Sequence, residues 1–528
     1  MPKSIKRPWN LTKRALAVMC VVALWAVGPD LRAQQAVDLA ALDSLFEQSR
    51  KAFNVPGMAI AIVKDDSVVL AKGYGLRQLG LPDRVDDETL FAIASNTKAF
   101  TSASLAILVD QGTLAWDDRV QRFYPEFQLY DPYVSADMRI EDLLSHRSGL
   151  GTFSGDLIWY GTPYSREEVV SRARYLKQAY PFRAGYGYSN IMFIAAGIVL
   201  ERSSKMSWED FVTEKILKPL GMESTVVSTT QLASRSNVAT PHGETDGVLT
   251  AFPWYNWDSM APAGGIISSA RDMSRWMRLQ LGHGTFDGTT IYKPAQARTM
   301  WTPHTSFVVS ERSEKSVPSR HFSGYGLGWE VSDYLGRKIV SHGGGYDGMF
   351  SHQALVPEER LGVIVLTNSM SSIASALTQE VLDAYLGAPE RDWSSEALAR
   401  QKRSEERRTA ERKKADSSRV LKSKPSLPIA SYAGTYGDAM YGNAEVRLEN
   451  GKLVLAMLPN PDLVADLAHW QYDTFVIEWR KKFPWFGDGT VQFVLDQNAR
   501  VSEMKIDVPN EDFWFTELEF TRSASADH

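Results

Sequence analysis

The chain has 528 residues, of which 44% are hydrophobic and 11% aromatic, so it is long enough for two or three domains and too apolar to be mainly disordered. Its 58 basic and 63 acidic residues give a net charge of −5, which excludes the overall positive field that drives nucleic-acid binding. The only cysteine is Cys20, which excludes disulfides, cysteine-based zinc sites and a cysteine nucleophile in the body of the protein.

Residues 1–33 have the pattern of a secretory signal peptide. Basic residues between positions 3 and 14 precede a 13-residue apolar run, 15–27, and the segment ends at the small residue Ala33. The alternative is a membrane anchor, but 13 apolar residues are too few to span a bilayer. We therefore expect cleavage near Ala33 and a periplasmic or secreted protein with no membrane span in the mature chain.

Residues 34–390 combine strand patterns at both ends with helical patterns between them. The spacing of apolar residues predicts a hairpin over 58–75 with its turn at Asp65–Asp66, and helices over 91–112, 191–203, 268–281 (capped by Ser268 or Ser269) and 373–386. Further strands are predicted over 325–331, 338–342 and 361–367. This order indicates an α+β fold, in which an antiparallel sheet is flanked by helices and an all-helical region, with its first and last strands as neighbours.

The composition changes after residue 390. Lys402 to Lys424 contains ten basic and four acidic residues, so 391–428 is interpreted as a solvated, partly helical linker, with an anion-binding arm as the alternative. Short runs of alternating apolar and polar residues then predict a small all-β domain over 429–522.

Several catalytic motifs are absent from the sequence. It contains no H-E-x-x-H, no phosphate-binding G-x-x-x-x-G-K-[ST], no dinucleotide-binding G-x-G-x-x-G between a strand and a helix, and no G-x-S-x-G elbow. The nine histidines are scattered. We therefore expect no metal and no cofactor.

One serine–lysine pair stands at the start of a predicted helix. Ser95 and Lys98 are three residues apart and share a helix face, so the amine can reach the hydroxyl. A buried lysine with a lowered pKa could accept the proton of this weak nucleophile. The alternative is a capping serine beside a surface lysine, and the same spacing recurs at Ser502 and Lys505, where we predict a strand and no function.

Two further motifs are candidates for the same site. Tyr188-Ser189-Asn190 precedes a predicted helix, and its phenol and amide can point into one cleft; the alternative is a helix cap with a packing tyrosine. Ser341-His342-Gly343-Gly344-Gly345 ends a predicted strand, where glycines let another backbone or a substrate approach the sheet. The alternative there is a turn with an incidental histidine.

In this order, S-x-x-K at 95, Y-x-N at 188 and H-G-G at 342 resemble the serine β-lactamase and penicillin-binding-protein superfamily, within which the chain looks like class C β-lactamases, D-alanyl-D-alanine carboxypeptidases, D-aminopeptidases and related esterases. LLSHRSGL (143–150), AGGIISSARDMSRWM (263–277), GYGLGWEV and LTNS (366–369) support the resemblance, which covers about residues 36–388. It implies a β-lactamase-like fold. The predicted C-terminal domain is similar to the domain of unknown function often appended to such hydrolases, where it could gate or extend the cleft or merely stabilise the chain.

The resemblance also implies roles for the candidate residues. Ser95 would be acylated, Lys98 would help to take its proton, and Tyr188 would exchange protons with the serine and the leaving group. Asn190 would hold Lys98 and the substrate amide, and the backbone N–H groups of Ser95 and Gly345 would form an oxyanion hole. Gly343 and Gly344 complete the expected substrate-binding strand.

His342-Gly343-Gly344 stands where many family members have K-T-G. Histidine carries only partial charge near neutral pH and Gly343 has no hydroxyl, so a substrate carboxylate is less favoured. The resemblance then implies a peptide or amide substrate, including non-standard or D-residue peptides. An esterase or β-lactamase of the same mechanism, and a penicillin-recognising sensor with little turnover, are the alternatives. The oligomeric state is not predicted.

Two neighbouring features have open interpretations. The aromatic cluster at 252–257 could line the substrate site or simply pack a loop on the core. His146 is interpreted as a structural hydrogen-bonding residue.

Overall fold

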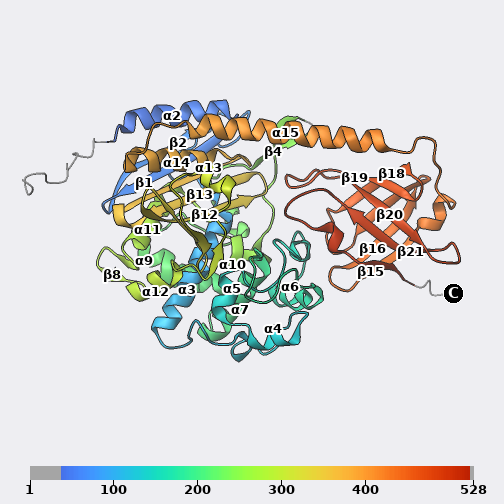
Figure 1. The fold of residues 1–528 in the computed structure, drawn as a ribbon, viewed down its shortest axis with the longest axis horizontal. Helices are drawn as coiled ribbons and strands as arrows, with labels where there is room; N and C mark the ends of the chain where they lie inside the picture. Colours follow the sequence, from blue (N-terminus) through green and yellow to red (C-terminus); the bar gives the residue numbers. More distant parts are fainter. Residues whose placement is uncertain (1–36, 246, 524–528) are drawn as a thin grey trace, which may run out of the picture.

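The computed structural model describes residues 37–245 and 247–523, and the predicted signal peptide lies outside them. An antiparallel sheet of eight strands, in the order β2-β1-β14-β13-β12-β11-β10-β9, is the centre of the first domain (Figure 1). Its strands are β1 (Gly57–Lys64), β2 (Ser67–Gly75), β9 (Thr305–Phe307), β10 (Ser323–Tyr325), β11 (Glu330–Tyr334), β12 (Arg337–Tyr346), β13 (Met349–Val356) and β14 (Leu361–Thr367). Ile60 of β1 pairs with Val365 of β14, which confirms that the first and last strands are neighbours.

The predicted hairpin between β1 and β2 is also confirmed. Asp65 and Asp66 have φ angles of 50° and 64°, the left-handed values that a two-residue hairpin turn of the I′ type requires. The predicted strand over 325–331 is wrong, because β10 ends at Tyr325 and β11 begins at Glu330. The chain reverses between them through Gly328, whose φ is 77°.

Helices cover both faces of the sheet. On one face, α2 (Leu39–Ala52) and α14 (Ile373–Leu386) bury side chains such as Phe46 and Leu377 against β1 and β14 (Figure 1). On the other face, α11 (Ala270–Leu281) packs on β1 and β14, and its Trp276 stacks on Phe100 of α3 (Thr97–Asp110) with ring centroids 3.7 Å apart. Ser269 caps α11 through the backbone N–H of Asp272, as predicted.

Most of the remaining helices form the helical region below the sheet (Figure 1). They are α4 (Pro132–Asp137), α5 (Ile140–Leu144), α6 (Arg166–Arg172), α7 (Asn190–Ser204), α8 (Trp208–Val212), α9 (Lys218–Leu220), α10 (Ala261–Gly264) and α12 (Pro294–Met300). Helix α13 (Glu311–Ser316) lies apart from them, and its Ser316 carbonyl accepts from Arg391. Short strand pairs join β3 (Phe91–Ala92) to β6 (Ile267–Ser268), β4 (His242–Thr245) to β5 (Val248–Ala251), and β7 (Thr285–Phe286) to β8 (Thr289–Thr290). The helix predicted from residue 91 therefore begins only at Thr97, because Phe91 and Ala92 are held in a strand pair.

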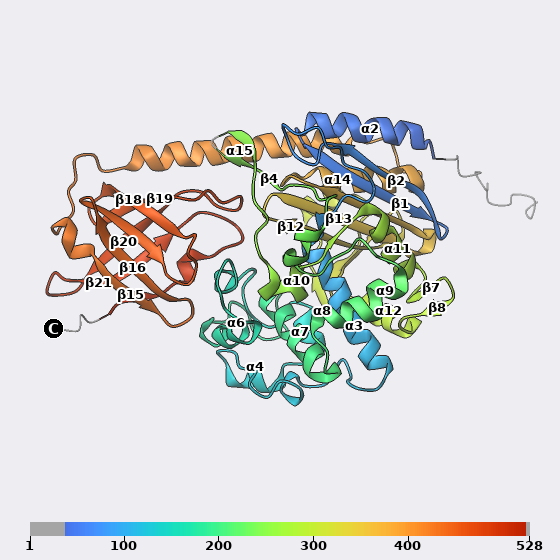
Figure 2. The same cartoon turned by 180° about the vertical axis from the view of Figure 1, so that it is seen from behind.

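The charged segment after the first domain is helical for most of its length. Helix α15 (Trp393–Ser418) buries Trp393 and Ala397 on the first domain, while its charged remainder is largely exposed. Figures 1 and 2 show it running from the sheet domain across to the C-terminal domain.

The C-terminal domain is a closed antiparallel barrel, which agrees with the predicted all-β class. Its strands are β15 (Gly434–Asp438), β16 (Gly442–Glu449), β17 (Lys452–Met457), β18 (Val464–Gln471), β19 (Thr474–Trp479), β20 (Gly489–Leu495), β21 (Val501–Asp507) and β22 (Phe520–Arg522). The buried rings of Tyr432, Phe475 and Phe493 pack on one another. Ser502 and Lys505 lie on β21, the strand predicted there.

Candidate active site

Ser95 lies in a single 3-10 turn, η2 (Ala94–Asn96), that enters the buried helix α3. Ala94 has a φ of 46°, a left-handed conformation that costs energy for a residue with a Cβ and is maintained by the surrounding structure. Part of that restraint comes from β13, because Ser351 Oγ donates to the Ile93 carbonyl at 2.8 Å and accepts from Asn96 Nδ2 at 2.8 Å. The turn therefore holds a half-buried Ser95 against the sheet.

Lys98 is fully buried one helical turn after Ser95. Its Nζ lies 3.0 Å from Ser95 Oγ and donates to Asn190 Oδ1 at 2.7 Å and to the Ala263 carbonyl at 2.9 Å. Burial holds the pKa of Lys98 well below its ordinary 10.5. A neutral amine has two N–H groups and one lone pair, so with both N–H groups bound to carbonyl oxygens its lone pair faces the Ser95 hydroxyl.

Tyr188 and Asn190 reach the same point from the start of α7. Ser189 caps that helix, which fixes the residues on either side of it. The Tyr188 ring lies 4.7 Å from Lys98 Nζ, and burial raises the pKa of its phenol well above 10, although a hydrogen bond with Ser95 acts in the opposite direction. The predicted residues Ser95, Lys98, Tyr188 and Asn190 are thus brought into one cluster.

Asp156 belongs to this cluster and was not predicted. It begins the short turn η4 (Asp156–Ile158), is only 2% exposed, and accepts a hydrogen bond from Asn190 Nδ2 at 2.6 Å. Nothing in the local sequence GDLIW marks it, because its partner lies on another element.

His342 lies on β12 beside Tyr188, with ring centroids 6.2 Å apart. Its Nδ1 donates to the Gly343 carbonyl, so its Nε2 accepts from the Tyr325 hydroxyl at 2.7 Å. Burial lowers its pKa to about 3, with the charge of Lys98 acting in the same direction. The expected partial charge at neutral pH is therefore corrected: His342 is a neutral imidazole.

The glycines of β12 let the strand approach Ser95. A Cβ on Gly344 would lie 2.2 Å from the Ile93 carbonyl oxygen and 3.0 Å from Ser95 N, closer than side chains tolerate. β11 pairs with β12 only as far as Ser341, so in the described sheet the 342–346 segment has a strand partner on one side only. Its other edge is available to an extended ligand.

The cluster opens into a cleft of about 440 Å³. The barrel supplies part of its wall, since Trp485, Asp512 and Phe513 line it together with Ser95 and Gly343–Gly345. Of the aromatic cluster at 252–257, only Trp257 lines the cleft. The C-terminal domain therefore extends the substrate side of the site.

Hydrogen bonds from the barrel hold the loop that carries Asp156. Glu517 accepts from Ser154 Oγ at 2.5 Å and from the backbone N–H of Gly155 at 2.8 Å. Trp514 Nε1 donates to the Thr152 carbonyl at 2.9 Å. These contacts hold the barrel against the 152–155 loop at the edge of the cleft.

His146 supports the site from behind. It is fully buried, accepts from the backbone N–H of Ser189 at 3.0 Å, and stacks on Tyr188 with ring centroids 4.1 Å apart. This geometry agrees with a structural role.

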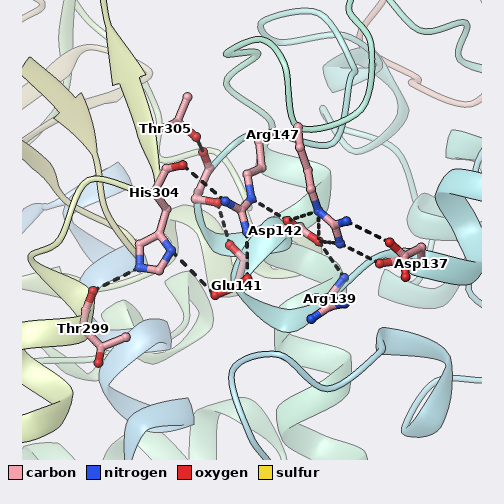
Figure 3. Close-up of polar contacts among 10 residues, drawn as sticks. Asp137, Arg139, Glu141, Asp142, Arg147, Thr299, His304 and Thr305 are labelled. Atoms are coloured by element: carbon pink, nitrogen blue, oxygen red, sulfur yellow. Dashed lines mark hydrogen bonds and ion pairs between the residues drawn. The ribbon is translucent and has the colours of Figure 1, made fainter.

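An ion-pair network anchors the segment that carries His146 (Figure 3). Asp142, fully buried, accepts hydrogen bonds from Arg147 and Arg183, and Arg147 also binds Glu141 at 2.8 Å. Thr305 donates to the Ser145 carbonyl at 2.8 Å. The network therefore ties helix α5 and the following loop to β9.

Two kinds of feature are absent from residues 37–245 and 247–523. Within these ranges no group of three or more His, Cys, Asp and Glu side chains is arranged to hold a metal ion. Likewise, no helix in this part of the chain is both long enough and apolar enough to cross a membrane.

Known proteins share this architecture. Unguisins hydrolase ungD' of Aspergillus campestris is 32% identical over 75% of each chain. A penicillin-binding protein homologue from Pyrococcus abyssi, described as octameric, superposes with a TM-score of 0.60 at 21% identity, over 92% of this chain and all of that one. EstCE1, a hydrolase with promiscuous acyltransferase activity, superposes with a TM-score of 0.55 at 19% identity, over 66% of this chain and 98% of that one.

Family models divide the chain in two. The model described as a domain of unknown function, DUF3471, matches residues 418–522. The model described as beta-lactamase matches residues 42–388, which include every predicted site residue. The chain belongs to the β-lactamase family of serine hydrolases.

Proposed function

We propose that the protein is a serine hydrolase that cleaves peptide or amide bonds through an acyl-enzyme on Ser95. The observation that carries the proposal is the position of Lys98 Nζ, 3.0 Å from Ser95 Oγ, with its two N–H groups bound to Asn190 and to the Ala263 carbonyl. An amine held in this way can act as a general base toward the hydroxyl.

The reaction then proceeds in two halves. Lys98 takes the proton of Ser95 as Oγ attacks the substrate carbonyl carbon, and the backbone N–H groups of Ser95 and Gly345 receive the developing oxyanion. Such a donor is worth about 3–4 kcal/mol in the transition state. Tyr188, whose phenol stays protonated because burial raises its pKa, donates a proton to the leaving amine as the C–N bond breaks, and Lys98 returns a proton to the phenol. Water then attacks the ester on Ser95 as Lys98 takes one of its protons, and that proton passes to Ser95 Oγ as the acid product leaves.

The lining of the cleft supports a peptide rather than an anionic substrate. The open edge of β12 can pair with an extended backbone. The described residues that line the cleft include the carboxylates of Asp156, Glu330 and Asp512 and no lysine or arginine, and His342 is neutral. A substrate carboxylate would lack a cationic partner there, which disfavours β-lactams and favours peptides or amides, non-standard and D-residue peptides included.

We also propose that the protein is exported. The support is the basic start, the apolar run at 15–27 and the small residue Ala33, all of which lie outside the described residues. Sequencing the amino terminus of the protein recovered from its native cells tests this; a chain that begins near residue 34 is expected, and an intact residue 1 would contradict it.

Product analysis by mass spectrometry tests the activity. The purified protein and its Ser95→Ala variant are incubated with a pool of linear L- and D-peptides, peptide amides, short esters and a β-lactam. We expect peptide or amide products that disappear in the variant. Ester or lactam products alone would replace the proposed substrate class, a stable Ser95 adduct without products would indicate a sensor, and identical profiles for both proteins would refute the mechanism.

A further inference from the structure

Asp156 places a buried carboxylate directly behind the catalytic amide. It is 2% exposed, and its Oδ2 accepts from Asn190 Nδ2 at 2.6 Å. The oxygen of the same amide, Asn190 Oδ1, accepts from Lys98 Nζ at 2.7 Å. Asp156, Asn190 and Lys98 therefore form one hydrogen-bonded row that ends at Ser95.

The Asp156 carboxylate sets the orientation of the Asn190 side-chain amide. In its ionised form the Asp156 carboxylate only accepts hydrogen bonds, so this form selects the Nδ2 side of Asn190 and turns Oδ1 toward Lys98. In the opposite orientation the amide N–H groups would point at Lys98 Nζ. The lone pair of Nζ would then no longer be directed at the Ser95 hydroxyl. A neutral partner that can both accept and donate would not impose this choice.

The charges of Asp156 and Lys98 oppose the effect of burial on each other's pKa. Burial lowers the pKa of Lys98, while the charge of Asp156 raises it. Burial also raises the pKa of Asp156, whereas hydrogen bonds from Trp159 and Asn190 and the charge of Lys98 lower it. Because the two groups are coupled, their ionisations belong to the pair.

Other groups face this pair from the neighbouring elements. Asp512 of the barrel adds a negative charge toward Asp156. The imidazoles of His146 and His342, whose pKa values are lowered by burial, are neutral, and the Tyr188 phenol is protonated. Asp156 is therefore the buried carboxylate that is hydrogen-bonded to the amide partner of Lys98.

We propose that Asp156 is a positioning residue that fixes the amide of Asn190 toward Lys98 and stabilises the positive charge that Lys98 acquires on taking the proton of Ser95. In that step the O–H proton moves to the lone pair of Nζ, Oγ forms a bond to the substrate carbonyl carbon, and the electron pair of the carbonyl moves onto its oxygen. The inference rests on the proposed acylation of Ser95 but not on the peptide nature of the substrate.

The test is the pH dependence of acylation in an Asp156→Asn variant of the full chain. The probe is p-nitrophenyl acetate, and the readouts are the burst of p-nitrophenolate and the acetyl adduct on Ser95 by mass spectrometry, from about pH 5 to about pH 9. Asparagine keeps the shape and can still accept from Asn190, but it removes the charge. We expect the acidic limb of the rate profile to move to lower pH by about one unit and the plateau rate to fall by roughly tenfold.

Two variants separate this role from a structural one. Asp347 is also fully buried beside the cleft, where it accepts from Tyr160 at 2.7 Å and from Trp257 at 2.9 Å. Asp347→Asn removes a buried carboxylate without touching the row, so its acidic limb should coincide with that of the unmodified protein. Asp156→Glu keeps the charge and should keep the original limb even where its plateau is lower.

The outcomes are distinct. An Asp156→Asn limb that coincides with the unmodified one would overturn the inference and leave the acyl-enzyme proposal standing. A limb that moves equally in Asp347→Asn would also overturn it, because the effect would then be unspecific. An unmodified protein that forms no Ser95 adduct would refute the proposed mechanism, and this inference with it.

Discussion

The close approach of β12 to the turn that carries Ser95 requires that residue 344 has no side chain. In Gly344→Ala the new Cβ would lie 2.2 Å from the Ile93 carbonyl oxygen and 2.6 Å from Ser351 Oγ, and neither a backbone carbonyl nor a hydroxyl held at 2.8 Å can give way easily. The strand and the turn must therefore separate by roughly 1 Å, and a displacement of that size costs about 100-fold in rate. The crowding itself should reduce the free energy of unfolding by about 1–3 kcal/mol.

Gly343→Ala is the matched control. Its Cβ would point to the opposite face of the strand, where the nearest atom is Phe350 Cζ at 3.6 Å, an ordinary contact. We expect its free energy of unfolding to change by no more than about 0.5 kcal/mol, so that it isolates the crowding at Gly344 from the general effect of an alanine in β12. The assays are kcat/KM for p-nitrophenyl acetate and urea unfolding of each variant. A Gly344→Ala protein with unmodified activity, or equal losses in both variants, would refute the reasoning.

Two further predictions concern stability. Asp142→Ala leaves Arg147 and Arg183 without their buried partner, so urea titration should show that the free energy of unfolding falls by about 3–5 kcal/mol. Asp83→Ala breaks an exposed pair with Arg77 and should lower it by less than about 1 kcal/mol. Similar losses in the two variants would contradict this reasoning. Because the pKa of His342 is about 3 when folded and 6.5 when unfolded, only the unfolded chain takes up that proton between these values. The free energy of unfolding therefore decreases by about 1.4 kcal/mol for each unit by which the pH is lowered within that window. His342→Gln should therefore lose less stability than the unmodified protein between about pH 7 and about pH 5, and equal losses would count against a neutral His342.

Features set by local pattern could be predicted from the sequence. β14 and α14 have the predicted bounds, because an uninterrupted apolar run and a helical period define them without help from the rest of the chain. Ser95 and Lys98 also follow from local spacing, since one helical turn brings their side chains together.

Features that depend on tertiary contacts could not be predicted from the sequence. The helix predicted from residue 91 starts at Thr97, because residues far along the chain, Ile267 and Ser268, pair with Phe91 and Ala92. The strand predicted over 325–331 is divided because a left-handed Gly328 allows a turn in an otherwise strand-like run. Asp156 was missed for the same reason, because its carboxylate joins the site only through a hydrogen bond from Asn190, which lies on α7.

The barrel is the largest part of the site that the sequence left open. Its sequence indicated alternating strands, but nothing in it indicated that Trp485 and Asp512 would reach the cleft of a serine more than 300 residues earlier. The barrel does more than line the cleft, because Glu517 accepts hydrogen bonds from Ser154 and Gly155, the two residues immediately before Asp156. Displacing the barrel would release the segment that places the buried carboxylate behind Asn190. Under the proposed mechanism the two domains therefore share one catalytic centre: the first supplies Ser95 and Lys98, and the second restrains the loop that leads to Asp156.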